Sequence, residues 1–203
     1  MPYLRTFINQ VVLTLRLVFH LNLSSVSIDD EKAGETIVDY LIEHGHTKIA
    51  EIGANLELSQ TARLRHNGYL NSLKKHGITP DERYYERARF SYDSAYRAMK
   101  KLLEKDIEIT AVYAISDVMA IGALRAILDK GLRVPEDISI TGFDGSTLAE
   151  YYNPKIVSIR QPHKDMAARS VELLFNMIDL HKGSCHEIIP FELTEGESVA
   201  RID

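Results

Sequence analysis

The stretch AVYAISDVMAIGALRAILDKGLRVPEDISITGFDGS, residues 111–146, decides the fold of this chain. It contains two short apolar runs, 111–115 and 138–143, on either side of a segment with the apolar pattern of a helix. The first run stops at Ser116-Asp117 and the second at Asp144. The order strand, helix, strand predicts a right-handed crossover between two parallel strands.

The same alternation extends over most of the chain. Strands are predicted at 25–28, 48–53, 84–90, 111–115 and 137–143, with helices between them at 31–45, 59–77, 91–106 and 117–131. Beyond Asp144 we predict a loop at 145–154, a strand at 155–160, a helix at 163–183 and a closing strand at 187–193. This order predicts the α/β class, with a doubly wound parallel sheet.

Composition excludes several classes of protein. The chain is 45% hydrophobic and 26% charged, which is typical of a globular protein, and its formal net charge of -5 does not favour broad contact with nucleic-acid phosphates. Cys185 is the only cysteine, which fits a reducing cytoplasm, and with His181 and His186 beside it a metal site still lacks a further ligand. No catalytic or cofactor-binding signature occurs, so we expect neither an enzyme nor a cofactor.

The leading segment is the most apolar part of the chain. Arg16 and His20 interrupt it, so it does not reach the roughly twenty apolar residues of a spanning helix. Leucines and a phenylalanine alternate with more polar residues from Leu13 to Leu23, which predicts a strand with one buried face.

Polar residues follow several of the predicted strands. Asp29, Ser116, Asp117 and Asp144 all lie at carboxyl ends, where parallel sheets bind their ligands. Helix capping explains Asp29, Ser116 and Asp117 equally well, because each precedes a predicted helix. Asp144 is either a free carboxylate near the crevice or a turn former.

Two further residues suggest a sugar site. Arg65 lies near the start of its helix and Phe90 at the end of a strand, although a solvated surface and a core position are the simpler interpretations of the two. A guanidinium, a carboxylate and an aromatic face together can bind the hydroxyl pairs and the apolar face of a sugar ring. Their convergence is therefore the test of the site.

The motifs resemble those of one known family. VSIDDEKAG, YLIEHGHTKIAEIG, ARLRHNGYLNSLKKHGI, SDVMAIGALRAILDKGLRVPEDISITGFD and PKIVSIRQP occur in the order found in effector-binding domains of the lactose/galactose repressor (LacI/GalR) family, over residues 26–199. The resemblance implies a periplasmic-binding-protein-like fold of two lobes that clamp a sugar or purine-like effector and dimerise. It also implies a cytoplasmic regulator without a membrane segment.

The resemblance assigns ligand-binding roles to residues of this chain. Arg65 resembles the family's effector-binding arginine, Asp144 its carboxylate and Phe90 its aromatic residue. Ser116 stands, next to Asp117, where the family commonly has asparagine, so a hydroxyl replaces an amide there.

The resemblance also predicts an organisation. Residues 1–25 form a leading segment without a family match, 26–160 the C-terminal lobe, 161–182 a helix returning toward the N-terminal lobe, and 183–203 the closing strand and C-terminus. We expect an N-terminally truncated effector-sensing domain, without its DNA-binding headpiece and most of the N-terminal lobe, that makes no specific DNA contact itself. The alternatives are a sugar receptor of a transport system, a partner of full-length repressors, and a non-functional gene fragment.

Overall fold

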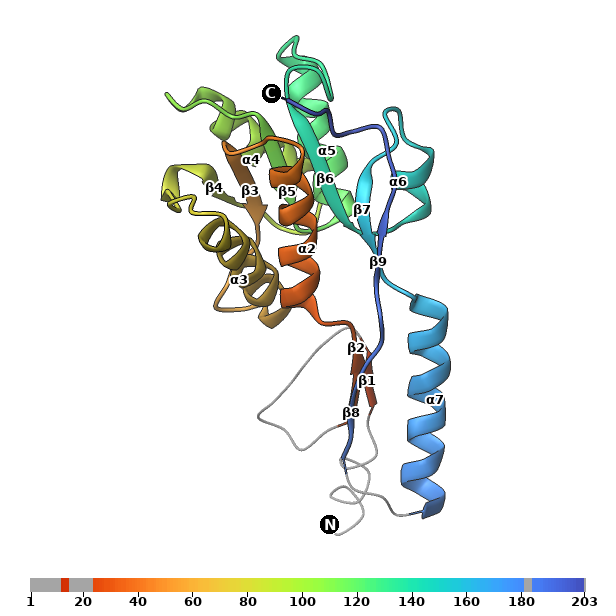
Figure 1. Ribbon diagram of the computed structural model, residues 1–203. Helices are drawn as coiled ribbons and strands as arrows, with labels where there is room; N and C mark the ends of the chain where they lie inside the picture. The colour runs from red at the N-terminus through yellow and green to blue at the C-terminus, as the bar shows by residue number, and fades with distance from the viewer. Residues whose placement is uncertain (1–11, 15–23, 181–183, 203) are drawn as a thin grey trace. The chain divides into compact units, whose positions relative to one another are not determined.

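The computed structural model describes residues 12–14, 24–180 and 184–202 (Figure 1). The chain divides into two units. The small unit contains Met1–Asp30 and Gln161–Phe191, and the large unit contains Glu31–Arg160 and Glu192–Asp203. Arg65, Phe90, Ser116, Asp117 and Asp144 all lie in the large unit, whereas Asp29 lies in the small unit.

A six-stranded sheet forms the centre of the large unit. Its strand order is β4-β3-β5-β6-β7-β9, and all neighbours are parallel except β7 and β9. The strands are β3 (Ile49–Gly53), β4 (Tyr85–Arg87), β5 (Ala111–Ala114), β6 (Ser139–Asp144), β7 (Val157–Arg160) and β9 (Glu192–Thr194). The prediction of an α/β fold with a mostly parallel sheet is confirmed.

Helices connect the strands and cover both faces of this sheet (Figure 1). They are α2 (Asp30–Glu43), α3 (Gln60–Lys75), the short 3₁₀ turn η1 (Glu82–Tyr84), α4 (Tyr92–Glu104), α5 (Asp117–Asp129) and α6 (Thr147–Tyr151). Every residue of β3 and β5 is buried, as expected for strands of a sheet covered on both faces. Ala95, Met99 and Leu102 of α4 are buried too.

The small unit has its own parallel sheet. Its strand order is β1-β2-β8, formed by Val12–Thr14, Ser24–Ser27 and His186–Ile188, and it also contains the helix α7 (His163–Leu180). Buried serines of β2 are paired within this unit: the hydroxyl of Ser24 donates to the sulfur of Met177 at 3.0 Å, and Ser25 lies 2.9 Å from the ring of His186.

Three predictions of local structure are wrong. The strand at 24–27 pairs in the small sheet rather than with the other strands of the alternation. The predicted loop at 145–154 contains α6, because the Ser146 hydroxyl accepts from the amide of Ala149 and caps a short helix. The single closing strand is two strands in two sheets, β8 and β9, separated around Pro190, which has no amide hydrogen to donate.

Some predictions fall outside what the structure describes. Of the leading segment, only the strand Val12–Thr14 is described before Ser24, and His181 also lies outside the described residues. The assignment of segments to lobes of a larger protein stays a prediction. Within the described residues, no helix is long and apolar enough to cross a membrane.

Candidate ligand-binding site

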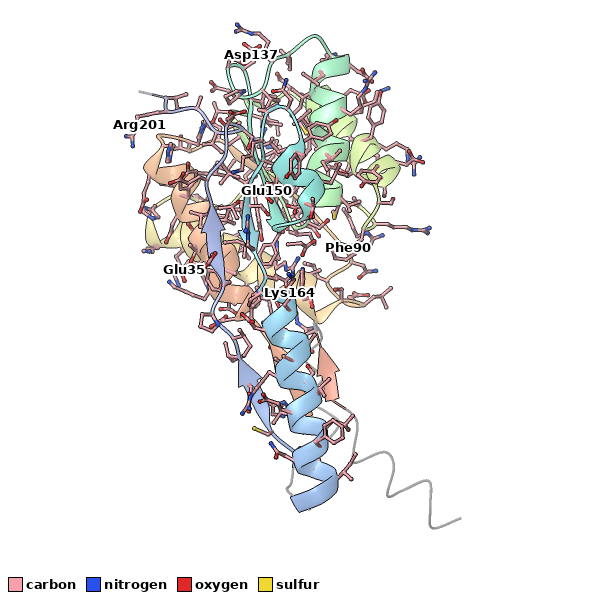
Figure 2. The ribbon with its side chains drawn as sticks, turned by 90° about the vertical axis from the view of Figure 1, so that its right-hand side faces the viewer. Glu35, Phe90, Asp137, Glu150, Lys164 and Arg201 are labelled. Carbon is pink, nitrogen blue, oxygen red and sulfur yellow. The ribbon has the colours of Figure 1, made fainter. Side chains whose placement is uncertain are left out.

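The carboxyl ends of the parallel strands share one edge of the large sheet. Phe90, which follows β4, and Asp137, which precedes β6, lie at opposite ends of the large unit (Figure 2). Helices also begin at the carboxyl edge, so their positive dipole ends add to a polar rim. The predicted residues can therefore be followed along this rim, strand by strand.

Arg65 is buried, although it carries a full charge. It is 4% exposed, and its Nη1 donates to the carbonyl of Ile115 at 2.6 Å, beyond the end of β5. The same nitrogen lies 3.5 Å from Oδ1 of Asp144, and the guanidinium carbon lies 3.5 Å from the ring centroid of Phe143. The interpretation of Arg65 as a solvated surface residue is wrong, because tertiary partners hold it over the end of the sheet.

A close contact between helices fixes the backbone at this arginine. A Cβ atom on Gly34 of α2 would lie 2.7 Å from the carbonyl oxygen of Arg65 on α3. Real Cβ atoms do not approach backbone so closely, so only glycine allows this packing of the two helices. The helix start is set by Ser59, whose hydroxyl accepts from the amide of Ala62 at 3.2 Å. The packing of α2 against α3 and the N-cap of α3 thus position the guanidinium.

Asp144 is held in an unfavourable backbone conformation. Its φ of 113° is positive, which L-residues other than glycine rarely adopt. Such a residue costs about 1–3 kcal/mol and persists where the surrounding structure imposes it, often at functional sites. The side chain is 32% exposed and lies beside Arg65, so the structure brings these two predicted residues together.

Ser116 and Asp117 make internal hydrogen bonds. Ser116 is the N-cap of α5, and its hydroxyl accepts from the amide of Met119 at 3.3 Å. Asp117 is 1% exposed, and its two oxygens accept from the Ser158 hydroxyl and the Ser146 amide, both at 2.6 Å. Burial raises the pKa of Asp117, and these hydrogen bonds oppose the increase. Their contact with a ligand stays a prediction.

Asp117 needs a glycine on the neighbouring strand. A Cβ atom on Gly142 of β6 would lie 2.3 Å from Oδ1 of Asp117. The carboxylate therefore reaches across β6 to Ser158 of β7 and, through Ser146, also holds the loop that follows Asp144. These hydrogen bonds hold the loop after the strained residue Asp144 and the strand β7 beside it.

Phe90 lines a cavity at the same edge. It is 50% exposed, so the interpretation as a core residue is wrong. The cavity has a volume of about 500 Å³ and lies between the segments that follow β3 and β4; its lining residues are Ala54, Asn55, Leu58, Ser59, Arg87, Ala88, Arg89, Phe90 and Ser94. An aromatic face open to a cavity is available to stack on a ligand ring.

Sequence reasoning missed several partners of the site. Phe143 beneath the guanidinium, the carbonyl of Ile115, and Ser158 were not predicted. Phe143 belongs to an apolar run and the carbonyl group carries no side-chain signal. Ser158 could have been suspected, as a small polar residue within the apolar strand KIVSIR.

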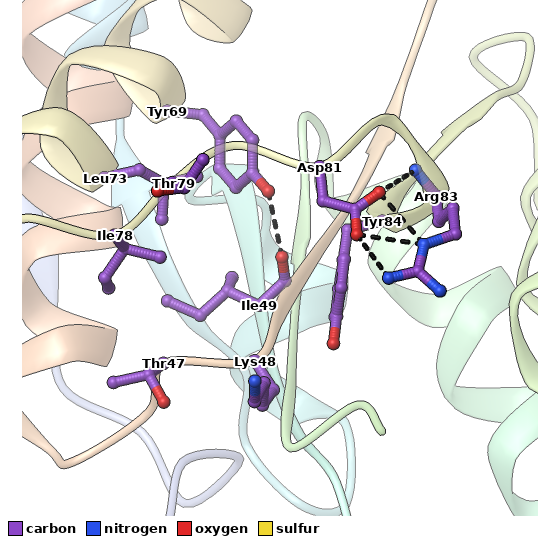
Figure 3. Close-up of a pocket in the computed structure, with 10 residues that line it drawn as sticks. All are labelled: Thr47, Lys48, Ile49, Tyr69, Leu73, Ile78, Thr79, Asp81, Arg83 and Tyr84. Atoms are coloured by element: carbon purple, nitrogen blue, oxygen red, sulfur yellow. Dashed lines mark hydrogen bonds and ion pairs between the residues drawn. The ribbon is translucent and has the colours of Figure 1, made fainter. Parts of the chain in front are cut away.

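A second cavity lies at the opposite end of β3 (Figure 3). It has a volume of about 300 Å³, and Thr47 and Lys48, which precede that strand, are among its lining residues. The Tyr69 hydroxyl donates to the carbonyl of Ile49 at 2.9 Å, and Asp81 and Arg83 pair with each other at 2.7 Å. The polar groups of Tyr69, Asp81 and Arg83 therefore interact within the protein, and none of the predicted ligand-binding residues lines this cavity.

Glu51 on β3 and His66 on α3 form a hydrogen-bonded pair. Glu51 of β3 is 0% exposed, and its Oε2 lies 2.6 Å from Nδ1 of His66. Its other oxygen has no hydrogen-bond partner among the described residues. Burial raises the pKa of Glu51; burial alone would lower that of His66, but the hydrogen bond and charge of Glu51 raise it. Since His66 follows Arg65 directly, this pair adjoins the site along the helix.

Cys185 does not belong to a metal-ligating cluster in the described part of the chain. Cys185 is exposed, 4.0 Å from Oε1 of Glu187. No group of three or more histidine, cysteine or acidic side chains that could hold a metal occurs among the described residues.

Comparisons with known proteins agree with the observed fold. Residues 38–199 match the family model described as a periplasmic binding protein-like domain. Over 179 residues the chain is 41% identical to the HTH-type transcriptional regulator MalR of Clostridium butyricum, an alignment that covers 88% of this chain and 53% of that protein. It is 36% identical to the HTH-type transcriptional repressor CytR of Escherichia coli over 174 residues, which are 85% of this chain and 51% of the repressor.

A solved structure shows the same fold. The complex of the transcriptional regulator CelR with cellobiose superposes with a TM-score of 0.86 at 33% sequence identity, covering 92% of this chain and 58% of that one. The chain thus spans about half the length of the curated relatives it matches.

Proposed function

The chain belongs to the LacI family of transcriptional regulators, as a periplasmic-binding-protein-like effector-binding domain, and on this premise we propose that it senses a sugar at the carboxyl edge of its large sheet. The pairing of Arg65 with Asp144 carries the proposal. A guanidinium and a carboxylate side by side offer donors and acceptors to adjacent hydroxyl groups.

The geometry favours a polyhydroxylated ring. Asp144 is partly exposed and held in a strained conformation, whereas Arg65 is buried and fixed by the Ile115 carbonyl and the Phe143 ring. A site fixed before the ligand arrives loses little conformational entropy on binding. Phe90 supplies an aromatic face on the same edge, and the related CelR was solved with cellobiose. A purine-like effector is the second candidate, because the Phe90 face suits any flat ring.

Effector binding would act by shifting a conformational equilibrium. In a regulator with two lobe arrangements, a ligand that prefers one of them changes the population and hence the affinity at a distant site. We propose this role for the intact family architecture, working as a cytoplasmic homodimer. Direct operator contact is not proposed for these residues, because the chain carries a formal net charge of -5.

The rival functions have less support. The family members matched are named as transcription regulators, which favours neither an enzyme nor a receptor of a transport system.

A thermal-shift screen of neutral sugars and nucleobases tests the proposal. A ligand at one hundred times its Kd stabilises the folded state by about 2.7 kcal/mol. At about 2–4 °C per kcal/mol for a chain of this size, the melting temperature should rise by about 5–10 °C. Asp144→Asn should abolish most of this increase, because the substitution removes the charged acceptor but keeps the shape of the side chain.

Asp137→Asn is the matched control. Asp137 also pairs with an arginine, Arg133, at 2.8 Å, and its side chain is 31% exposed against 32% for Asp144, but it lies at the other end of the unit (Figure 2). This variant should respond to the sugar as the unmodified chain does. No stabilisation by any compound, or an equal response in Asp144→Asn, would contradict the proposed site.

A further inference from the structure

Two arginines line the cavity beside Phe90. Arg87 is the last residue of β4 and Arg89 follows two positions later; both are exposed and both line the cavity of about 500 Å³. No carboxylate lies within ion-pair distance of either guanidinium in the part of the chain that the structure describes. Among the other exposed arginines of this unit, Arg83, Arg125 and Arg133 pair with an acid, whereas no ion pair with a described residue is formed by Arg63, Arg97 or Arg201.

The backbone directs both side chains to the same side. Ala88 lies between them, is 6% exposed, and its amide donates to the carbonyl of Gly53 at 2.8 Å, which continues the pairing of β4 with β3. In extended backbone, residues two apart point to the same face and lie about 6–7 Å apart. The amide of Arg89 is fixed by the Ser94 hydroxyl at 2.9 Å. The two guanidinium groups are thus presented together.

The cavity has no negative charge to balance them. Its lining contains no aspartate or glutamate; Glu57 and Asp93 lie nearby in the sequence but are not among the lining residues. The N-caps of α3 and α4, Ser59 and Ser91, lie in the segments that border the cavity, so the positive ends of both helix dipoles add to the arginines. Phe90 contributes an aromatic face to the same positively charged cavity.

We infer that the effector is an anionic sugar, one that carries a phosphate ester or a carboxylate. Arg87 and Arg89 hold the anionic group, while Phe90 stacks on the ring. Guanidinium groups bind phosphate and carboxylate oxygens through paired, charge-assisted hydrogen bonds, which are stronger than those between neutral groups. This inference rests on the proposed function and narrows it from sugars in general to charged ones.

Isothermal titration calorimetry of the whole chain tests the inference. The probes are glucose, glucose 6-phosphate, glucuronate, ribose, ribose 5-phosphate and inorganic phosphate, each measured at low and at physiological ionic strength. At least one anionic sugar should bind about tenfold more tightly than its neutral parent at low salt, with the difference decreasing as salt is added. The phosphate and carboxylate probes show which anionic group is preferred.

Substitution of Arg87 and Arg89 tests the binding of the anionic group separately from the binding of the sugar ring. The double variant Arg87→Gln/Arg89→Gln should reduce the preference for an anionic sugar over its neutral parent to within about twofold, because it removes the two positive charges that hold the anionic group. The control Arg125→Gln/Arg133→Gln removes the same charge from the same unit, away from the cavity, and should retain the preference.

The possible results distinguish failure of this inference from failure of the proposed function. Neutral sugars that bind as tightly as charged ones, or a preference that survives in Arg87→Gln/Arg89→Gln, would overturn this inference and leave the proposed function intact. Inorganic phosphate that binds as tightly as a sugar phosphate would overturn it as well, because the cavity would then hold an anion without a sugar. Failure of every sugar to bind would remove the proposed function and the inference together.

Discussion

The strained backbone at Asp144 should lower the stability of the chain, while its carboxylate serves ligand binding. The variants Asp144→Ala and Asp144→Gly both remove the carboxylate and its 3.5 Å contact with Arg65, so these losses cancel when the two are compared. Only alanine keeps a Cβ atom at a φ of 113°. Relief of the strain stabilises the glycine variant by about 1–3 kcal/mol, whereas the greater freedom of glycine in the unfolded chain offsets about 0.5–1 kcal/mol.

The glycine variant should therefore be more stable than the alanine variant by about 0.5–2 kcal/mol. At about 2–4 °C per kcal/mol, its melting temperature should be about 1–8 °C higher. Urea denaturation of both variants, followed by circular dichroism, gives the difference directly, and neither should bind a sugar. An alanine variant as stable as the glycine variant would refute the strain at this position, and full sugar binding by either would refute the role of the carboxylate.

Two further predictions concern the residues around the site. In an NMR titration the pKa of His66 should lie above the ordinary histidine value of about 6.5, and in Glu51→Gln below it, because burial then acts without the acid. A group whose pKa is higher in the folded than in the unfolded chain stabilises the folded state at pH values below its unfolded pKa, and this stabilisation is lost as the pH rises through its folded pKa. The pKa values of both His66 and Glu51 are raised, so both groups contribute in this direction. The melting temperature should thus fall more steeply from pH 6 to pH 8 in the unmodified chain than in Glu51→Gln; equal slopes would count against the pair. Gly142→Ala should lower the free energy of unfolding by about 2–4 kcal/mol. The added Cβ would lie 2.3 Å from Oδ1 of Asp117 and displace this buried carboxylate from its hydrogen bonds. A loss below about 0.5 kcal/mol in urea denaturation would show that the carboxylate does not need this space.

Much of the fold could be predicted because its signals are local. Helix caps such as Ser59 and Ser116, and the apolar runs of β5 and β6, are visible within a few residues. The assignment of β2, β8 and β9 to their sheets could not be read in this way, because strand pairing joins residues far apart in the sequence. Pro190 was the one local signal that the closing strand would break.

The candidate site was predictable in its members but not in its geometry. Arg65 looked like a surface residue because the groups that bury it, Ile115 and Phe143, come 50 or more residues later. The conformation of Asp144 depends on the loop and the strand beside it, which no pattern in GFDGS reveals. The residues were found through chemistry at strand ends and through a family resemblance; their contacts required the folded chain.

The shared site at the carboxyl edge is tested most directly by NMR. The isotopically labelled chain should be titrated with the charged and neutral sugars, and the amide shifts followed residue by residue. We predict saturable shifts at Asp144 and Gly145 and at Phe90, with none around Asp137 at the opposite end of the unit (Figure 2). Saturable shifts confined to other parts of the large unit, or no saturable shift with any sugar, would contradict a ligand site at this edge.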